Sequence, residues 1–266
     1  MEAGEYPPWH PRGRLWKLDV QSCLLHHWRN RSFGHCAGCP LFLCISCRCS
    51  WCSVYCYHNR NFGFSDLDHM DQAAVCLWRW RNYGQVHRVV LSHLDYDGEG
   101  KILEVGCGSG ALTIRSALTW PKAKVIGVDY WGAVYNYSKA LCEKNAAREG
   151  VASRCVFQHG DAKQLDFPDE SFDVVISNYV YHNVMGADMQ KLLLESLRVL
   201  KKGGVFALND DMKPKMYGDM EGFAQKLRDM GYEEVRLVDT AQEAFGSHRR
   251  AAMMMLGSSR LLVGRK

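Results

Sequence analysis

The sequence lacks a strong excess of charge of either sign. Its 33 Lys and Arg residues face 29 Asp and Glu residues, so the formal net charge is only +4 over 266 residues. Residues 96–266 carry 23 basic and 22 acidic side chains. A surface that follows nucleic-acid phosphates needs a larger and clustered basic excess. The balance therefore argues against nucleic acid as a partner.

The sequence also lacks a secretory signal and has few cysteines beyond residue 95. Residues 1–20 are polar, contain prolines and have no apolar core of the kind that a signal peptide needs. The last 171 residues hold only Cys107, Cys142 and Cys155. Isolated thiols of this kind are typical of a reduced, cytoplasmic domain rather than a disulfide scaffold.

Cysteine is concentrated in the N-terminal third instead, where seven of the 12 lie between Cys36 and Cys56. Residues 21–64 follow neither a helical nor a strand period, and three interpretations stay open. Their Cys-x-x-Cys spacings suit zinc-binding thiolates. Residues 40–56 carry one charge, Arg48, and suit contact with a membrane. The third interpretation is an unstructured or aberrant segment.

A helix-capping sequence, Ser65-Asp66, marks the return of regular patterns. We therefore expect an irregular extension over residues 1–65 and the main domain over residues 66–266. A helix is expected between residues 70 and 94, followed by a polar turn at residues 95–100.

From residue 101 onward, short apolar runs alternate with longer amphipathic ones. The short runs are β-branched and bounded by turn residues, as buried strands are, and occur at 102–105, 125–128, 155–159, 174–177 and 205–208. Helical spacing occurs at 111–118, 133–148 and 189–200, with Gly150 where a left-handed helix stop belongs. This order predicts a doubly wound, mostly parallel α/β sheet whose ligand lies at the carboxyl ends of the strands.

The C-terminal segment continues the pattern with one more helix and two more strands. The helix is expected at 218–230, and the strands at 234–238 and 260–264. A closing pair of strands without a long crossover is most simply an antiparallel edge of the same sheet.

The first strand ends in a glycine loop, Ile102 to Gly110, which reads ILEVGCGSG. A dinucleotide-binding loop is written G-x-G-x-x-G, whereas here the third glycine falls one place earlier. Glu104, two places before the first glycine, would repel a pyrophosphate and favour a cationic amino group. A tight strand-to-helix turn without a ligand is the alternative.

Acids follow the second and third strands as well. Asp129 ends the second strand, where a carboxylate accepts hydrogen bonds from both ribose hydroxyls of a nucleoside. Asp161 follows the third strand, where it suits an adenine amino group. NAD would satisfy Asp129, but a nucleoside with an ammonium in place of phosphates, S-adenosylmethionine, also explains Glu104.

With these motifs in order, and with the segments 158–162 and 172–178 at suitable spacing, residues 101–210 resemble the class I S-adenosylmethionine-dependent methyltransferases, particularly the small-molecule group often called type-11-like. The resemblance implies a Rossmann-like, seven-stranded sheet whose last two strands close one edge as an antiparallel pair. It also implies S-adenosylmethionine as the cofactor and a small-molecule methyl acceptor.

The resemblance assigns cofactor-binding roles by position. They fall to Glu104 beside the methionine end, Gly106, Cys107, Gly108 and Gly110 in the loop, Asp129 at the ribose, Tyr130 and Trp131 flanking the adenine, Asp161 and Ala162 at the adenine edge, and Asn178 closing the fourth-strand loop. Simpler alternatives exist, because Tyr130 and Trp131 also suit a cap on the sheet and Asp161 also suits a turn.

Methyl transfer needs in-line placement of the acceptor and, for some acceptors, a base, but no metal. The fourth-strand loop offers Tyr181 and His182 as candidate catalytic residues, with a structural histidine as the alternative for His182. Residues 177–180 read SNYV and lack the Asn-Pro-Pro-Tyr motif of enzymes that methylate adenine or glutamine amino groups. A small-molecule acceptor is therefore expected.

Three other functions share some of these sequence features. Arsenic methylation needs thiolates around the site, and only three cysteines lie in this part of the chain. An NAD-dependent oxidoreductase would share the sheet but gives no reason for Glu104. A non-catalytic S-adenosylmethionine-binding or membrane-tethered protein would keep the glycine loop and Asp129, and the sequence leaves that alternative open.

Overall fold

The computed structural model describes residues 84–132 and 137–266. The cysteine-rich extension, the zinc and membrane interpretations of its residues 21–64, and the domain boundary at residue 66 lie outside the described residues. Within the described part, residues 84–92 form a helix, in line with the later half of the helix expected between residues 70 and 94. Among the described residues, 84–130 and 138–266 belong to one compact unit, whose architecture follows.

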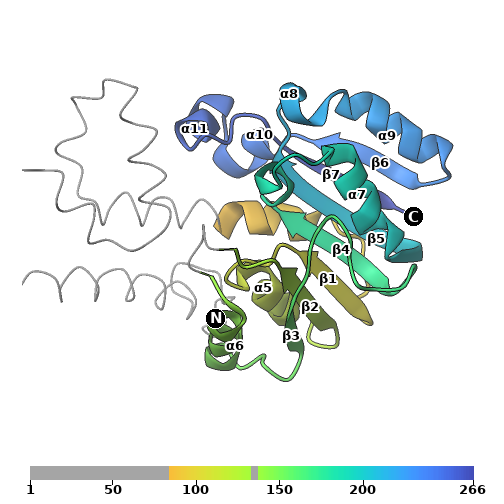
Figure 1. Cartoon of the computed structure of the whole chain (residues 1–266). Coiled ribbons are helices and arrows are strands. Elements are labelled where there is room, and N and C mark those ends of the chain that lie inside the picture. Colours follow the sequence, from red (N-terminus) through yellow and green to blue (C-terminus); the bar gives the residue numbers. More distant parts are fainter. Residues whose placement is uncertain (1–83, 133–136) are drawn as a thin grey trace, which may run out of the picture. The chain divides into compact units, whose positions relative to one another are not determined.

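Seven strands form one sheet in the order β3-β2-β1-β4-β5-β7-β6 (Figure 1). The strands are β1 Lys101–Val105, β2 Lys124–Asp129, β3 Cys155–His159, β4 Phe172–Asn178, β5 Leu200–Asp211, β6 Glu233–Val238 and β7 Ser259–Arg265. Neighbouring strands from β3 to β5 pair in parallel, whereas β7 runs antiparallel to both β5 and β6. The predicted seven-stranded, mostly parallel sheet with an antiparallel edge is confirmed.

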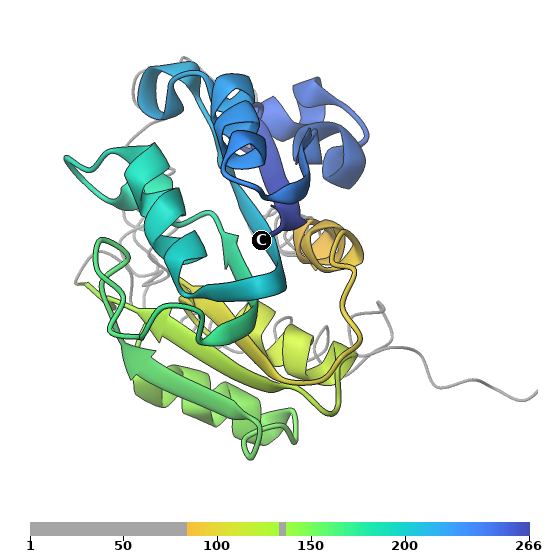
Figure 2. The ribbon, with the colours of Figure 1, turned by 90° about the vertical axis from the view of Figure 1, so that its right-hand side faces the viewer.

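Helices cover both faces of this sheet (Figure 2). They are α5 Ala111–Thr119, α6 Lys139–Arg148, α7 Met189–Arg198, α8 Pro214–Tyr217, α9 Met220–Asp229, α10 Thr240–Phe245 and α11 His248–Met253. Helices α7 and α9 pack their apolar side chains against one face, where alternate residues of the strands, such as Leu103 and Val105 of β1, are buried. Helix α5 and the helix at 84–92 lie on the other face.

Several predicted boundaries shift, and two helix boundaries do so for clear local reasons. The helix expected at 189–200 ends at Arg198, because Leu200 already pairs with Phe172 as the first residue of β5. The helix expected from residue 218 begins at Met220, since Gly218 has a left-handed φ of 67° and the Asp219 side chain caps the helix. Gly150 has a φ of 71°, as a left-handed helix stop requires.

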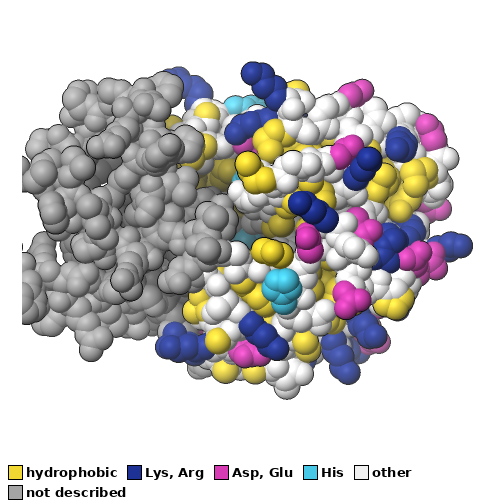
Figure 3. Space-filling view, in the orientation of Figure 1, with side chains coloured by type: hydrophobic (Ala, Val, Ile, Leu, Met, Phe, Trp, Pro, Cys, Tyr) yellow, Lys and Arg dark blue, Asp and Glu magenta, His cyan; other side chains and the backbone are white. Residues whose placement is uncertain are grey.

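The surface mixes both signs of charge, in keeping with the balanced composition. In Figure 3 the Lys and Arg side chains on the visible face are interspersed with Asp and Glu rather than gathered in one field. The described part contains no helix that combines the length and the apolar character needed to cross a bilayer.

Candidate functional site

The glycine loop turns sharply after β1 and lies against β2. The backbone N–H groups of Gly106 and Cys107 both donate to the carbonyl oxygen of Val128, at 2.7 and 3.0 Å. Gly106 has a φ of 76°, and a Cβ at this position would lie 2.1 Å from Cγ2 of Val180. Only glycine fits here, for its backbone conformation and for the space available.

Asp129, at the end of β2, holds the middle of the loop. The backbone N–H of Gly108 donates to Oδ2 of Asp129 at 2.8 Å. The loop ends at Gly110, which has a left-handed φ of 82° and immediately precedes the first turn of α5. The thiol of Cys142 on α6 donates to the Gly108 carbonyl at 3.2 Å. The loop is therefore fixed from both β2 and α6, and the Asp129 carboxylate lies against the backbone of the glycine loop.

Glu104 is a buried carboxyl beside this loop. Glu104 belongs to β1 and is only 3% exposed. Its Oε2 accepts a hydrogen bond from the hydroxyl of Thr113 on α5. Burial raises the pKa of Glu104 to about 8, and the negative charge of Asp129 adds to the shift, although the Thr113 hydrogen bond opposes it. A cation close to Glu104 would favour its ionised form.

The residues expected around an adenine lie beyond β2 and β3. Tyr130 is 63% exposed, and its ring lies 5.1 Å from that of His159. Trp131 has a positive φ of 44°. Oδ1 of Asp161 accepts a hydrogen bond from the Lys163 backbone N–H at 2.8 Å, which is the turn geometry that the alternative interpretation described. Ala162 is half-buried.

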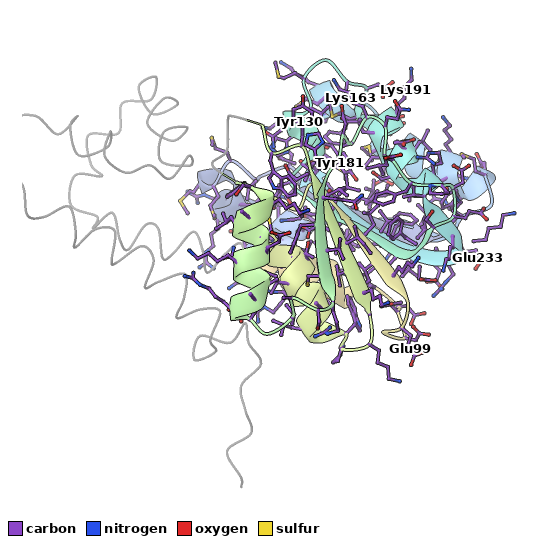
Figure 4. All side chains as sticks on the ribbon, turned by 60° about the horizontal axis from the view of Figure 1, so that its bottom comes forward. Glu99, Tyr130, Lys163, Tyr181, Lys191 and Glu233 are labelled. Atoms are coloured by element: carbon purple, nitrogen blue, oxygen red, sulfur yellow. The ribbon has the colours of Figure 1, made fainter. Side chains whose placement is uncertain are left out.

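Figure 4 shows that Tyr130 and Lys163 lie at one end of the sheet and Glu99 at the other. The first two follow the carboxyl ends of β2 and β3, whereas Glu99 precedes β1. The predicted cofactor residues therefore belong to the edge of the sheet where ligands of doubly wound folds bind.

Asn178, at the end of β4, belongs to a polar network. Its Oδ1 accepts a hydrogen bond from Nδ2 of Asn209 at 2.8 Å, and Oδ1 of Asn209 accepts one from the Thr240 hydroxyl at 2.8 Å. The network joins β4, β5 and α10. It holds the start of the fourth-strand loop, where Tyr179 has a strained φ of 57°.

The two candidate catalytic residues of that loop have different surroundings. A short 3₁₀ helix, η2 Tyr181–Asn183, places Tyr181 in the core with no exposed surface, and its hydroxyl is hydrogen-bonded to Ser196 Oγ at 2.9 Å. Burial raises the pKa of Tyr181 to about 12. The structure does not support the predicted catalytic role of Tyr181, because a completely buried hydroxyl cannot touch an acceptor.

His182 lies at the edge of the core and pairs with Asp210 of β5. Its Nδ1 is hydrogen-bonded to Oδ1 of Asp210, and its backbone N–H donates to Oδ2 at 3.2 Å. The histidine side chain is 29% exposed and the Asp210 side chain is completely buried. Since Nδ1 faces Asp210, Nε2 is the nitrogen that remains for a reacting group.

The surroundings of His182 also change its acidity. Burial lowers the pKa of His182, but the hydrogen bond and the charge of Asp210, helped by the charge of Asp211, outweigh burial and leave the pKa raised. Lys213 opposes that increase. A histidine held by a buried carboxylate is the arrangement of a general base.

Asp210 is the residue that the sequence did not single out. It lies in a run of three polar residues, Asn209 to Asp211, and which of them faces the site depends on strand alternation at the end of β5. The only sequence signal for Asp210 is its position at the end of the fifth strand, which it shares with its two polar neighbours. The described residues contain no group of three or more side chains suited to hold a metal ion.

Comparisons with known proteins agree with this geometry. Residues 103–208 match the family described as a methyltransferase domain. The chain is 33% identical over 143 residues to a sterol 24-C-methyltransferase of Aspergillus fumigatus, covering 53% of this chain and 36% of that protein. It is 33% identical over 150 residues to a demethylmenaquinone methyltransferase of Symbiobacterium thermophilum, covering 56% of each. The chain therefore spans little more than half the length, or less, of these relatives.

The fold also occurs in a solved structure with low sequence identity. The geranyl diphosphate C-methyltransferase of Streptomyces coelicolor A3(2) superposes with a TM-score of 0.57 at 13% identity, covering 76% of this chain and 86% of that one. This likeness concerns the fold alone.

The contact between Gly106 and Val180 can be tested by substitution. We expect Gly106→Ala to lower the free energy of unfolding by about 2 to 4 kcal/mol, from backbone strain and overlap together. The matched control is Gly203→Ala, which has a similar φ of 75° but open space around its Cβ. It should cost only about 1 kcal/mol. Equal losses in urea unfolding would contradict a steric role for Val180.

The raised pKa of Glu104 predicts a pH-dependent stability. A carboxyl that binds its proton more tightly in the folded state contributes stability that is present below the unfolded pKa and is lost as the pH rises through the folded value of about 8. Glu104→Gln keeps an acceptor for Thr113 and should remove this loss, so the variant should be more stable than wild type above that pH. Urea unfolding at a series of pH values measures it. Glu143→Gln, at an exposed position on α6, is the control, and its stability should not exceed that of wild type at high pH.

Proposed function

We propose, since the chain belongs to the class I S-adenosylmethionine-dependent methyltransferases, that it moves a methyl group from S-adenosylmethionine to an O, N or C atom of a small molecule. The observation that carries the proposal is the hydrogen bond from Gly108 to Asp129, which holds a strand-end carboxylate against the glycine loop. This loop begins two residues after the buried Glu104. A nucleoside with a positively charged tail complements these three features.

The residues fit this cofactor. Gly106, Gly108 and Gly110 bring no side chains to the loop, and the methionine and ribose portions would lie against its backbone. Asp129 would accept the ribose hydroxyls, and Asp161 and Ala162 would meet the adenine. Glu104, whose ionisation is disfavoured by burial, would gain a cationic partner in the amino group. When bound, the cofactor supplies an electrophilic methyl group on a sulfonium.

The same features disfavour NAD. Its pyrophosphate would be placed beside a buried acid and a glycine loop whose third glycine lies one residue too early. Neither difference concerns the sheet, which both cofactor classes share. The discrimination therefore rests on Glu104 and the loop.

We assign His182 as the general base of the acceptor side. Its Nδ1 is hydrogen-bonded to Asp210, so its Nε2 would take the proton that an acceptor O–H, N–H or activated C–H loses. His182 would hold that proton, while the cofactor would supply the methyl group and leave as a neutral thioether when its bond from sulfur to the methyl carbon breaks. Asp210 would stabilise the imidazolium that results.

A small molecule suits the acceptor side better than a macromolecule. The two relatives are named for methylation of a sterol and of demethylmenaquinone. The face shown in Figure 3 mixes both signs of charge, and the fourth-strand loop lacks the proline motif of base and amide methyltransferases. Which acceptor is used depends on contacts that neither relative's name defines for this chain.

The cofactor assignment is tested by calorimetric titration of the full chain. We expect S-adenosylmethionine to bind with micromolar affinity and NAD not to bind. Asp129→Ala should weaken S-adenosylmethionine binding at least about tenfold, or about 1.4 kcal/mol, because the ribose hydroxyls and the loop lose a shared carboxylate. Asp166→Ala, at an exposed acid in the loop after β3, should bind like wild type. Binding of NAD alone, or of neither ligand, would refute the proposal.

The base assignment is tested by steady-state kinetics with radiolabelled S-adenosylmethionine and a panel of sterol and quinol acceptors. His182→Gln should lower kcat about 100-fold or more and leave cofactor affinity unchanged. Because the pKa of His182 is raised, wild-type activity should rise with pH through a midpoint above 6.5. In Asp210→Asn that midpoint should move to lower pH, since the charge that favours the imidazolium is gone. Full activity of His182→Gln would exclude the histidine as base.

A further inference from the structure

The hydroxyl of one buried tyrosine near this histidine and aspartate has no hydrogen-bond partner among the described residues. Tyr217, the last residue of α8 (Figure 1), is 2% exposed and packs in the main apolar core. Its hydroxyl makes no hydrogen bond of ordinary geometry to any described atom. Buried hydroxyls nearly always have a partner, because desolvation without one is costly. A tyrosine in place of phenylalanine here therefore needs a reason.

The hydroxyl lies close to the charge that controls His182. Burial raises the pKa of Tyr217 most. The charge of Asp210 and the approach of the hydroxyl to that carboxylate raise it further, with smaller contributions from Tyr181 and Asp211. Tyr217 therefore stays protonated and can act only as a donor toward a carboxylate. Asp210 already accepts hydrogen bonds from the His182 ring, the His182 backbone and the Asp211 backbone, the last at 2.6 Å.

The backbone fixes where this hydroxyl can go. The Tyr217 N–H donates to the Lys213 carbonyl at 3.0 Å, and its own carbonyl accepts from Nε2 of Gln190 on α7 at 2.9 Å. Pro214 restrains the start of α8. With both ends of the residue held, a small rotation of the ring is the movement left to the hydroxyl, and Asp210 is the strongest acceptor that its surroundings offer.

We propose that Tyr217 is a positioning residue of the His182–Asp210 pair, whose hydroxyl donates to the Asp210 carboxylate and limits how strongly that carboxylate holds the imidazolium. This rests on the proposed role of His182 as base. Without such a donor, the groups that face His182, namely Asp210 and Asp211 of β5 and Lys213 before α8, would leave the imidazole too basic to release its proton readily. Tyr217 adds a neutral donor to the same carboxylate.

The test reads the His182 ring directly by NMR, in full-length protein with labelled histidine. His182→Gln identifies the signal among the 11 histidines. In Tyr217→Phe we expect the pKa of His182 to rise by about half a unit, on the order of a threefold change in its protonation constant. An unchanged or lowered pKa would overturn the proposal and leave Tyr217 as a packing residue.

Two further variants separate this effect from a change in folding. Tyr179→Phe removes a hydroxyl that is hydrogen-bonded to Ser259 at 2.8 Å in the same region, and should leave the His182 pKa unchanged. In an Asp210→Asn background, Tyr217→Phe should cause no additional shift, since the two act through one carboxylate. An additional shift of equal size in that background would refute the route through Asp210.

The measurement needs no turnover, so it is independent of the cofactor proposal. Calorimetry with S-adenosylmethionine on the same Tyr217→Phe sample should give the wild-type affinity. If the histidine shifts as expected while no cofactor binds, the proposed function fails and the coupling of Tyr217 to Asp210 stands. If the cofactor binds and the pKa of His182 does not shift, the cofactor proposal stands and the coupling of Tyr217 to Asp210 is refuted.

Discussion

The close contact of Gly106 with Val180 is the constraint on which the site depends. Gly106 belongs to the glycine loop after β1, and Val180 lies in the loop after β4, immediately before η2. A Cβ on Gly106 would overlap Val180, so the two loops are in contact because one of them has no side chain. That contact fixes the distance between the glycine loop and the turn that carries His182. A methyl donor and a base require just such a fixed separation.

Buried carboxyls give the same edge of the sheet its electrostatic character. Glu104 and Asp210 are almost completely buried, and each would be costly without a proton or a cation beside it. Asp210 has the His182 ring, whereas Glu104 has a neutral threonine and a raised pKa. The protein therefore satisfies one acid within its own structure and leaves the other satisfied by protonation. An ammonium group from a ligand is the natural replacement for that proton, and its binding would release the proton to solvent.

The sequence predicted the sheet well because a buried parallel strand is apolar throughout and short. Residues 155–159 were predicted without error. The other strands extend beyond their predicted ranges by paired end residues, most of them polar, which hydrophobic periodicity cannot detect. The short helices α8, α10 and α11 were missed, since four to six residues are too few to show a helical period. The extension before residue 84 and the roles of individual site residues stay predictions.

Tyr181 and His182 illustrate why site residues are harder to predict than strands. They are neighbours in sequence and share a loop, and nothing in their spacing decides which one enters the core. The 3₁₀ turn of η2 decides it by rotating Tyr181 toward Ser196 and His182 toward Asp210. Asp210 escaped prediction for the same reason, because the end of β5 presents three polar residues in succession. A protein that only bound a nucleoside would have no need of a completely buried aspartate aimed at a half-buried histidine, so this pair favours catalysis over binding alone.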